Sequence, residues 1–242
     1  QLKNGKTIYT YGPIVHNEEV VRELSEKGVR VLENKEELKH LKAGENIPTV
    51  IIRAHGVAKE IYDIMEANGL ECIDATCPFV KKIHRIVEQK STEGYHVIVV
   101  GDPKHPEVEG IVGWCQGPVT VLETPEQAEK YVKTEGEKLC IVSQTTYNYN
   151  KFQYIVEIFE KKGYNDSVVN TICNATEERQ RSAKAIAAEA DVMIVIGGRH
   201  SSNSRKLYEI CQRECEHTYF IQTLDDLHLD LPKAVRLVGI TA

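Results

Sequence analysis

The stretch Val97-Ile98-Val99-Val100-Gly101-Asp102-Pro103-Lys104-His105-Pro106-Glu107 decides the fold, because its pattern occurs three times along the chain. A β-branched run that ends at a glycine is typical of a buried parallel strand. Two further runs of this kind, residues 7–12 and 193–197, end at Gly12 and Gly197. Polar residues stand four and six positions after each glycine, as the pairs His16 and Glu18, His105 and Glu107, and Ser201 and Asn203. The sequence therefore predicts three structural repeats, each with a helix after its first strand.

The second half of the pattern also repeats. Each copy continues with a second apolar strand, at residues 31–32, 121–122 and 220–221. A helix N-cap pair follows each strand, namely Asn34 with Glu37, Thr124 with Gln127, and Thr223 with Asp226. A third strand comes next, at residues 50–52, 140–142 and 237–238. It precedes the loops that carry His55 and Thr145 in the first two copies, and residues 239–242 in the third.

Two cysteines occupy matching positions in this repeat. Cys77 lies 24 residues before Gly101, and Cys173 lies 24 residues before Gly197. The same spacing from Gly12 places an equivalent third cysteine about a dozen residues upstream of Gln1. The third copy stops at Ala242, where its last loop is due, so we expect the chain to lack a segment at each end.

The repeat predicts an α/β fold of three small α/β units with short, mainly parallel sheets arranged about a pseudo-threefold axis. We place the units at residues 1–76, 77–172 and 173–242. Ligands of open α/β sheets bind beyond the carboxyl ends of the strands. The polar residues expected there, facing a common centre, are His16, His55, His105, Glu107, Thr145, Ser201 and Asn203.

Composition narrows the class of protein. The 242 residues are 41% hydrophobic and 27% charged, which is typical of soluble proteins, and no apolar run is long enough to span a bilayer. A net charge of −6 gives no general attraction to nucleic acid. Seven cysteines, an odd number without a dense disulfide spacing, indicate reduced thiols and a cytoplasmic location.

One cysteine from each repeat would suit a metal cluster at the common centre. Thiolates select iron–sulfur clusters, copper(I) or zinc, and three thiolates on a four-iron cluster leave one iron open to a substrate. The alternative is that Cys77 and Cys173 are ordinary buried thiols, but their matched spacing favours ligands. For the remaining cysteines we expect a buried structural role; these are Cys72, Cys115, Cys140, Cys211 and Cys215.

The loop residues also suit a diphosphate. Histidines donate to phosphate oxygens, and Ser201, Ser202 and Asn203 stand near a helix N-terminus, where anions bind. Glu107 is a candidate proton donor for a leaving hydroxyl group. Its alternative role is that of an acid in the first turn of a helix, which is the role we expect for Glu18.

Six motifs occur in an order and spacing that resemble those of the LytB family, the hydroxymethylbutenyl diphosphate reductases. The motifs are Gly12-Pro13-Ile14-Val15-His16-Asn17, Arg53-Ala54-His55-Gly56-Val57, Asp74-Ala75-Thr76-Cys77-Pro78, His105-Pro106-Glu107-Val108-Glu109-Gly110, Ser143-Gln144-Thr145-Thr146 and Ser201-Ser202-Asn203-Ser204. The resemblance covers nearly the whole chain. It implies an oxidoreductase that removes the hydroxyl group of an allylic diphosphate, 4-hydroxy-3-methylbut-2-enyl diphosphate. The products would be isopentenyl and dimethylallyl diphosphates, in the last step of the non-mevalonate pathway of isoprene biosynthesis.

The resemblance also implies the site. A [4Fe-4S] cluster would be held by three cysteines, two of them Cys77 and Cys173, and an external donor such as ferredoxin or flavodoxin would supply electrons. Glu107 would provide a proton, and Thr145 would lie near the substrate hydroxyl. The residues implied to hold the diphosphate are His16, His55, His105, Ser201, Ser202 and Asn203.

Two departures from the family pattern and two rival functions bear on this interpretation. The family's first cysteine and its last serine-bearing loop are absent, so we expect these 242 residues alone not to assemble a stable cluster. A quinolinate-synthase-like enzyme would share the threefold architecture and the open iron. A cluster-free module that binds a diphosphate or another partner is the second rival.

Overall fold

The computed structural model describes residues 7–44, 46–164, 166–228 and 234–242. The chain divides into two compact units. The first unit comprises Gln1–Val15, Glu19–Gln144 and Lys151–Thr171, and the second comprises His16–Glu18, Thr145–Asn150 and Ile172–Ala242. Gln1, from which the position of the upstream cysteine is counted, lies outside the described residues.

The first sheet contains four parallel strands in the order β2-β1-β3-β4. Its elements are β1 (Ile8–Tyr11), α1 (Glu18–Glu26), β2 (Arg30–Leu32), α2 (Lys35–His40), β3 (Thr49–Ile52), α3 (Lys59–Ala67) and β4 (Glu71–Asp74). Val50 and Ile52 of β3 pack with Leu38 of α2 and Met65 of α3 in one hydrophobic cluster. Burial of these apolar side chains stabilises the short helices, which would be marginal on their own.

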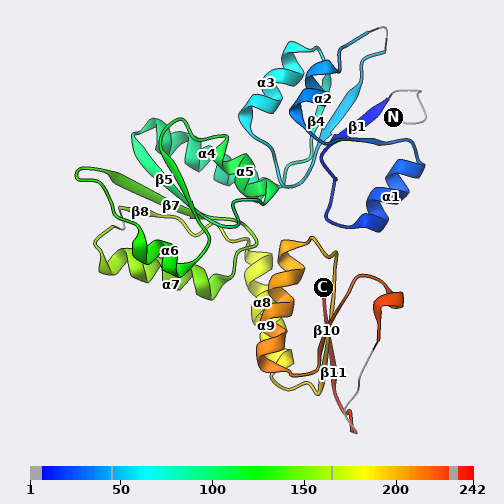
Figure 1. The fold of residues 1–242 in the computed structure, drawn as a ribbon, viewed down its shortest axis with the longest axis vertical. Coiled ribbons are helices and arrows are strands. Elements are labelled where there is room, and N and C mark those ends of the chain that lie inside the picture. The colour runs from blue at the N-terminus through cyan, green and yellow to red at the C-terminus, as the bar shows by residue number, and fades with distance from the viewer. Residues whose placement is uncertain (1–6, 45, 165, 229–233) are drawn as a thin grey trace. The chain divides into compact units, whose positions relative to one another are not determined.

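The second sheet repeats this order as β6-β5-β7-β8, again with parallel strands. Its elements are α4 (Pro78–Thr92), β5 (Tyr95–Val100), α5 (Pro106–Val112), β6 (Val119–Leu122), α6 (Pro125–Lys130), β7 (Lys138–Ser143), α7 (Tyr149–Lys161) and β8 (Ser167–Val168). Side chains of α4 and α5 pack against β5 and β7, while α6 and α7 lie on the other side of the sheet (Figure 1).

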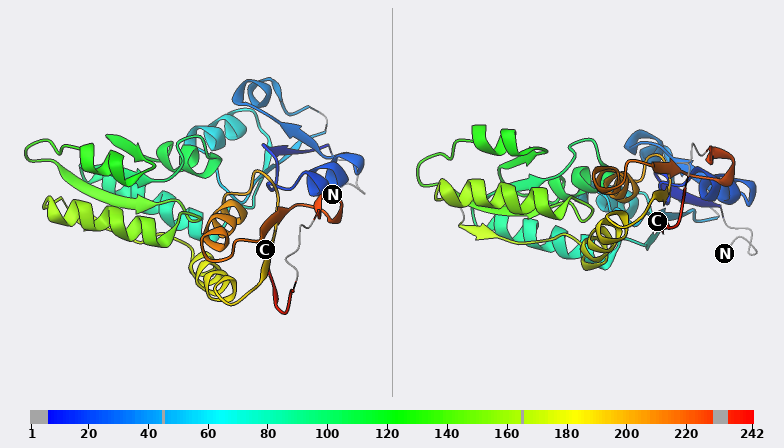
Figure 2. Two further views of the ribbon diagram at one scale, coloured as in Figure 1. Left: turned by 60° about the horizontal axis from the view of Figure 1, so that its bottom comes forward. Right: turned by 90° about the horizontal axis from the view of Figure 1, so that it is seen from below.

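The third sheet has the order β10-β9-β11, and its strands are also parallel. Its elements are α8 (Asn174–Ala187), β9 (Val192–Ile196), α9 (Ser202–Glu214), β10 (Thr218–Ile221), the 3-10 helix η2 (Leu224–Asp226) and β11 (Val238–Thr241). Helices α8 and α9 lie side by side (Figures 1 and 2) and cover one face of the sheet. Ala183 of α8 and Leu207 of α9 pack in one cluster with Met193 of β9.

The three sheets confirm the predicted α/β class and its internal repeat. The first strand of each copy, β1, β5 or β9, lies in the middle of its sheet. The glycine after this strand donates its N–H to the last carbonyl of the second strand in every copy. These bonds are Gly12 to Leu32 (2.8 Å), Gly101 to Leu122 (3.0 Å) and Gly197 to Ile221 (2.9 Å). The boundaries at residues 76 and 172 and the pseudo-threefold arrangement stay predictions.

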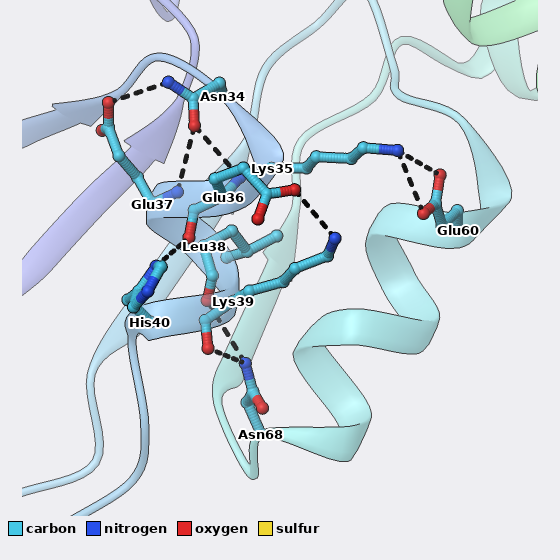
Figure 3. A network of polar contacts seen from close by, with 9 residues as sticks. All are labelled: Asn34, Lys35, Glu36, Glu37, Leu38, Lys39, His40, Glu60 and Asn68. Atoms are coloured by element: carbon cyan, nitrogen blue, oxygen red, sulfur yellow. Dashed lines mark hydrogen bonds and ion pairs between the residues drawn. The ribbon is translucent and has the colours of Figure 1, made fainter.

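The predicted N-caps form, with one difference. The Asn34 side chain accepts bonds from the amides of Glu36 and Glu37, both at 3.0 Å, while Asn68 donates to the carbonyls of Leu38 and Lys39 at the other end of α2 (Figure 3). Thr124 and Gln127 form the expected capping box.

The third cap pair starts only a single 3-10 turn. Asp226 accepts from the amides of Gln222 (2.9 Å) and Thr223 (3.0 Å), as a capping residue does, but η2 ends at Asp226. None of its three residues is buried. A turn without a buried apolar side chain gains no tertiary packing that would extend it into an α-helix.

The last strand extends beyond the two residues that mark it in the sequence. We expected an apolar strand at residues 237–238 and the start of the next loop near Ala242, and β11 runs from Val238 to Thr241 and pairs in parallel with β9. Ile240 and Thr241 are β-branched and suit a pleated strand, so the strand continues through Gly239. Within the described residues, no helix combines the length and the apolarity that a bilayer-spanning helix needs.

Candidate functional site

Two predicted histidines lie together in the first unit. His55 follows β3, and its ring meets the ring of His105 edge to face, with 5.5 Å between the ring centroids and 74° between the planes. His105 is the N-cap of α5, and its Nδ1 accepts a hydrogen bond from the amide of Glu107 at 3.2 Å. In the neutral ring the proton then lies on Nε2, which makes that nitrogen a donor suited to a phosphate oxygen.

Glu107 differs in burial from its equivalent in the repeat. Its side chain lies in the first turn of α5 with only 2% of its surface exposed. The side chain of Glu18, at the same position of the repeat, is 68% exposed and forms a long ion pair of 3.8 Å with His200. Burying a carboxylate costs free energy, so the two equivalent residues differ in environment. The role of Glu107 as a proton donor and the helix-start role of Glu18 stay predictions.

Gln144 is a site residue that the sequence analysis did not single out. It follows β7, is 1% exposed, and its Oε1 accepts from the amide of Asp102 at 3.2 Å. Because Asp102 begins the loop that carries His105, Gln144 holds that loop against the end of β7. Its place beside Thr145 in a conspicuous motif was the available signal, but the motif alone does not reveal a buried contact.

The two predicted cluster cysteines occupy equivalent positions. Cys77 is the N-cap of α4, and Cys173 is the N-cap of α8. The amide of each donates at 3.0 Å to a loop that follows a third strand, Cys77 to the Ala54 carbonyl and Cys173 to the Thr145 carbonyl. Both thiols are partly accessible. Accessible sulfur atoms at equivalent positions can reach a soft metal, so both residues fit a ligand role.

Four of the remaining five cysteines fit the structural role that we expected. Cys140, Cys211 and Cys215 are buried, and burial raises the pKa of Cys211 to about 11. Burial likewise raises the pKa of Cys115 to about 12. The expectation was wrong for Cys72, which is exposed on β4. Strand β4 is the edge strand of its sheet, and its side chains alternate between half-buried and exposed, with Cys72 on the exposed side.

The second unit gathers the other predicted residues at the carboxyl end of β9. Ser201 caps α9, and its Oγ accepts from the Ser204 amide at 3.3 Å. Ser202 accepts from the hydroxyl of Thr146, in the loop of Thr145, at 3.0 Å. The carbonyl of His16 lies against Gly198, directly after β9. Three loops of the repeat thus meet in this unit.

Asn203 adds an observation that points to a ligand. Its Oδ1 is buried and makes no hydrogen bond within the described part of the chain. A buried acceptor without a donor costs about 1–3 kcal/mol, so such groups call for a partner. Asn203 is the second residue of α9, and the N-terminus of a helix attracts anions.

The predicted site residues therefore fall into two groups, each at the carboxyl ends of strands. The first unit brings together His55, His105, Glu107 and, on the adjoining loop, Cys77. The second unit brings together the loops of His16, Thr145, Cys173, Ser201, Ser202 and Asn203. The meeting of both groups at one centre stays a prediction.

The loop of His55 is fixed by a glycine that no other residue can replace. Gly56 has a φ of +71°, and a Cβ there would lie 2.7 Å from His84 and 3.1 Å from Thr76, the neighbour of Cys77. We expect Gly56→Ala to lower the free energy of unfolding by about 3 kcal/mol, from left-handed strain and overpacking together. Gly28→Ala is the control, since Gly28 has a φ of +90° but open space around it. It should cost only about 1 kcal/mol, and equal losses in chemical denaturation would contradict the packing argument.

His84 makes stability depend on pH. It is 3% exposed and stacked on Trp114, with centroids 5.1 Å apart, and burial lowers its pKa from 6.5 to about 4. The unfolded chain takes up a proton below pH 6.5 that the folded chain refuses, so stability present above pH 6.5 is lost as the pH falls toward 4. The loss should reach about 2 kcal/mol at pH 5.

His84→Phe keeps the stack and removes the titrating group. Its free energy of unfolding should therefore change less between pH 8 and pH 5, by about 2 kcal/mol, than that of the wild type. Urea titrations at the two pH values measure the difference. Parallel pH profiles for both proteins would exclude His84 as the source of the acid sensitivity.

The chain matches the LytB protein family over residues 1–242. A relative from Caldanaerobacter subterraneus subsp. tengcongensis, named 4-hydroxy-3-methylbut-2-enyl diphosphate reductase, is 45% identical over 235 residues, which are 97% of this chain and 80% of the relative. A relative of the same name from Clostridioides difficile is 42% identical over 240 residues, 99% of this chain and 84% of its own length.

Solved structures agree with these matches. The E-1-hydroxy-2-methyl-but-2-enyl-4-diphosphate reductase from Plasmodium falciparum superposes with a TM-score of 0.89 at 30% identity, over 99% of this chain and 74% of that one. A second structure, described as (E)-4-hydroxy-3-methyl-but-2-enyl diphosphate reductase, has a TM-score of 0.65 at 41% identity, over 98% and 82%. Together with the strand order and the equivalent helix N-cap positions of Cys77 and Cys173, these similarities show that the chain belongs to the LytB family.

Proposed function

We propose that this chain is an oxidoreductase that converts 4-hydroxy-3-methylbut-2-enyl diphosphate into isopentenyl and dimethylallyl diphosphates, the last step of the non-mevalonate pathway. Its relatives carry the name of this reductase. The observation that carries the proposal is the equivalence of Cys77 and Cys173, each at a helix N-cap and bonded to a strand-end loop. Two such thiols beside polar loops suit redox chemistry on an anionic substrate.

We infer that Cys77 and Cys173 are two of the three thiolate ligands of a [4Fe-4S] cluster. Their partial accessibility and their position at helix N-termini support this assignment. When bound, the cluster supplies single electrons and a Lewis-acidic iron. The electrons come from an external carrier such as a ferredoxin or a flavodoxin.

Hydrogen-bond donors on the predicted loops bind the diphosphate. His105 presents its Nε2 proton, as its Nδ1 bond dictates, and the serines at the start of α9 add hydroxyl donors beside a helix N-terminus. Asn203 lies in the first turn of the same helix, where its Nδ2 group can donate to the diphosphate, while its buried Oδ1 can accept from the substrate hydroxyl. The full set in this role is His16, His55, His105, Ser201, Ser202 and Asn203.

Glu107 holds the proton for the departing hydroxyl group, and Thr145 orients that group. The overall reaction breaks one carbon–oxygen bond, consumes two electrons and two protons, and releases water. The position of Glu107 next to His105, with 2% of its surface exposed, supports its assignment as the proton donor.

Turnover with defined substrates tests the proposal. Anaerobically purified full-length protein that contains these 242 residues should convert the hydroxylated allylic diphosphate into both products when reduced methyl viologen supplies the electrons. Conversion of the substrates of quinolinate synthase instead would favour that rival. Diphosphate binding by a protein that contains no iron would favour a cluster-free module.

A further inference from the structure

Helix α4 presents an exposed face directly after Cys77. Val80, Ile83, His84 and Val87 form its buried side, at the spacing expected for a helix packed on a sheet. The opposite side is exposed at Phe79, Lys82, Arg85 and Gln89, with Phe79 44% exposed. An exposed aromatic side chain two residues from a proposed cluster ligand is a candidate contact for a partner.

This face carries uncompensated positive charge. Lys81 is neutralised by Asp74 at 2.7 Å, and Glu88 is paired with Lys59 at 2.6 Å. Lys82 and Arg85 form no ion pair within the residues that the structure describes. The first two turns of α4 contain no acidic residue. The helix therefore offers two unpaired cations around an exposed aromatic ring.

Helix α8, which follows Cys173 as α4 follows Cys77, differs in charge. Lys82 and Arg85 lie five and eight residues after Cys77, whereas Glu178 and Arg181 lie five and eight residues after Cys173. Glu177 adds a second acid to the first turns of α8. The cationic face is thus a property of α4 and not of every helix that follows a proposed cluster ligand.

We propose that Phe79, Lys82 and Arg85 form the docking surface for an acidic one-electron carrier protein. This inference rests on the proposed function, which requires electrons from an external carrier. An exposed aromatic centre with a charged rim is typical of a small transient interface. The cations attract an anionic surface and raise the rate of encounter. Docking here brings the carrier next to Cys77 in the chain.

A charge reversal tests the docking surface. We expect Lys82→Glu with Arg85→Glu to weaken the binding of a bacterial ferredoxin at least about tenfold in low salt, as measured by calorimetry. The residual binding should depend less on salt than that of the wild type. Turnover with reduced methyl viologen, which needs no protein docking site, should stay within about twofold of wild type. Phe79→Ala should weaken ferredoxin binding without changing its salt dependence.

Arg181→Glu on α8 is the matched control, because it reverses the same charge at the equivalent position. It should leave ferredoxin binding unchanged. Unaltered binding by the α4 double variant, or weaker binding by the α8 variant alone, would overturn the proposal. A wild-type protein that fails to turn over with methyl viologen would count against the proposed function, while the binding measurement still decides the docking surface.

Discussion

Glu107→Gln is expected to lower kcat by about 10²–10⁴-fold while the protein stays folded, because the amide keeps the shape of the side chain but cannot donate a carboxyl proton. Glu107 is buried in the first turn of α5, and its backbone N–H donates to Nδ1 of the His105 ring. Since the side-chain amide of the introduced glutamine can still form hydrogen bonds, KM for the diphosphate should change much less than kcat. Single-turnover kinetics with pre-reduced protein measure the affected step directly.

Glu109→Gln is the matched control for this substitution. Glu109 lies two residues further along α5 and is exposed. The substitution makes the same carboxyl-to-amide change on the same helix, and kcat should stay within about twofold of wild type because no proton transfer is lost. Equal losses in both variants would show that the effect does not come from the proton of Glu107.

Cys77→Ser is expected to abolish turnover and to lower the iron content of anaerobically purified protein, because a serine hydroxyl is a poor replacement for a soft thiolate ligand. Cys173→Ser should have the same effect, since both residues occupy equivalent helix N-caps. The free energy of unfolding of the iron-free proteins should change little, because both side chains are only partly buried.

Cys72→Ser provides the comparison for the cysteine variants. Cys72 is an exposed thiol on β4, five residues before Cys77. Iron content and turnover should match the wild type. Full iron in Cys77→Ser, or iron loss in Cys72→Ser, would show that the ligand assignment is wrong.

The repeat made most of the fold predictable. Strands β1, β5 and β9 are central in their sheets, so their apolar β-branched runs stand out in the sequence. The caps of α2 and α6 were predictable because they depend only on residues three positions apart. The short η2 turn was not, because whether a cap is followed by a full helix depends on packing that the local pattern does not contain.

The site was predictable in its residue types and less so in their environments. Glu18 and Glu107 occupy the same position of the repeat, and only the folded chain shows that one is exposed and the other buried. Gln144 and His84 act through contacts with residues 42 and 30 positions away, Asp102 and Trp114. Such long-range contacts leave no trace in strand or helix periodicity. The exposure of Cys72 likewise follows from its place on the exposed side of β4, the edge strand of its sheet.

The central claim is that Cys77 and Cys173 belong to a four-iron cluster with one iron accessible to the diphosphate substrate. Mössbauer spectroscopy of iron-57-enriched full-length protein, recorded with and without the substrate, tests this claim most directly. The account predicts the signal of four irons per chain, of which about one in four changes when the substrate is added. A spectrum that the substrate leaves unchanged, or a protein that binds the substrate without containing iron, would contradict it.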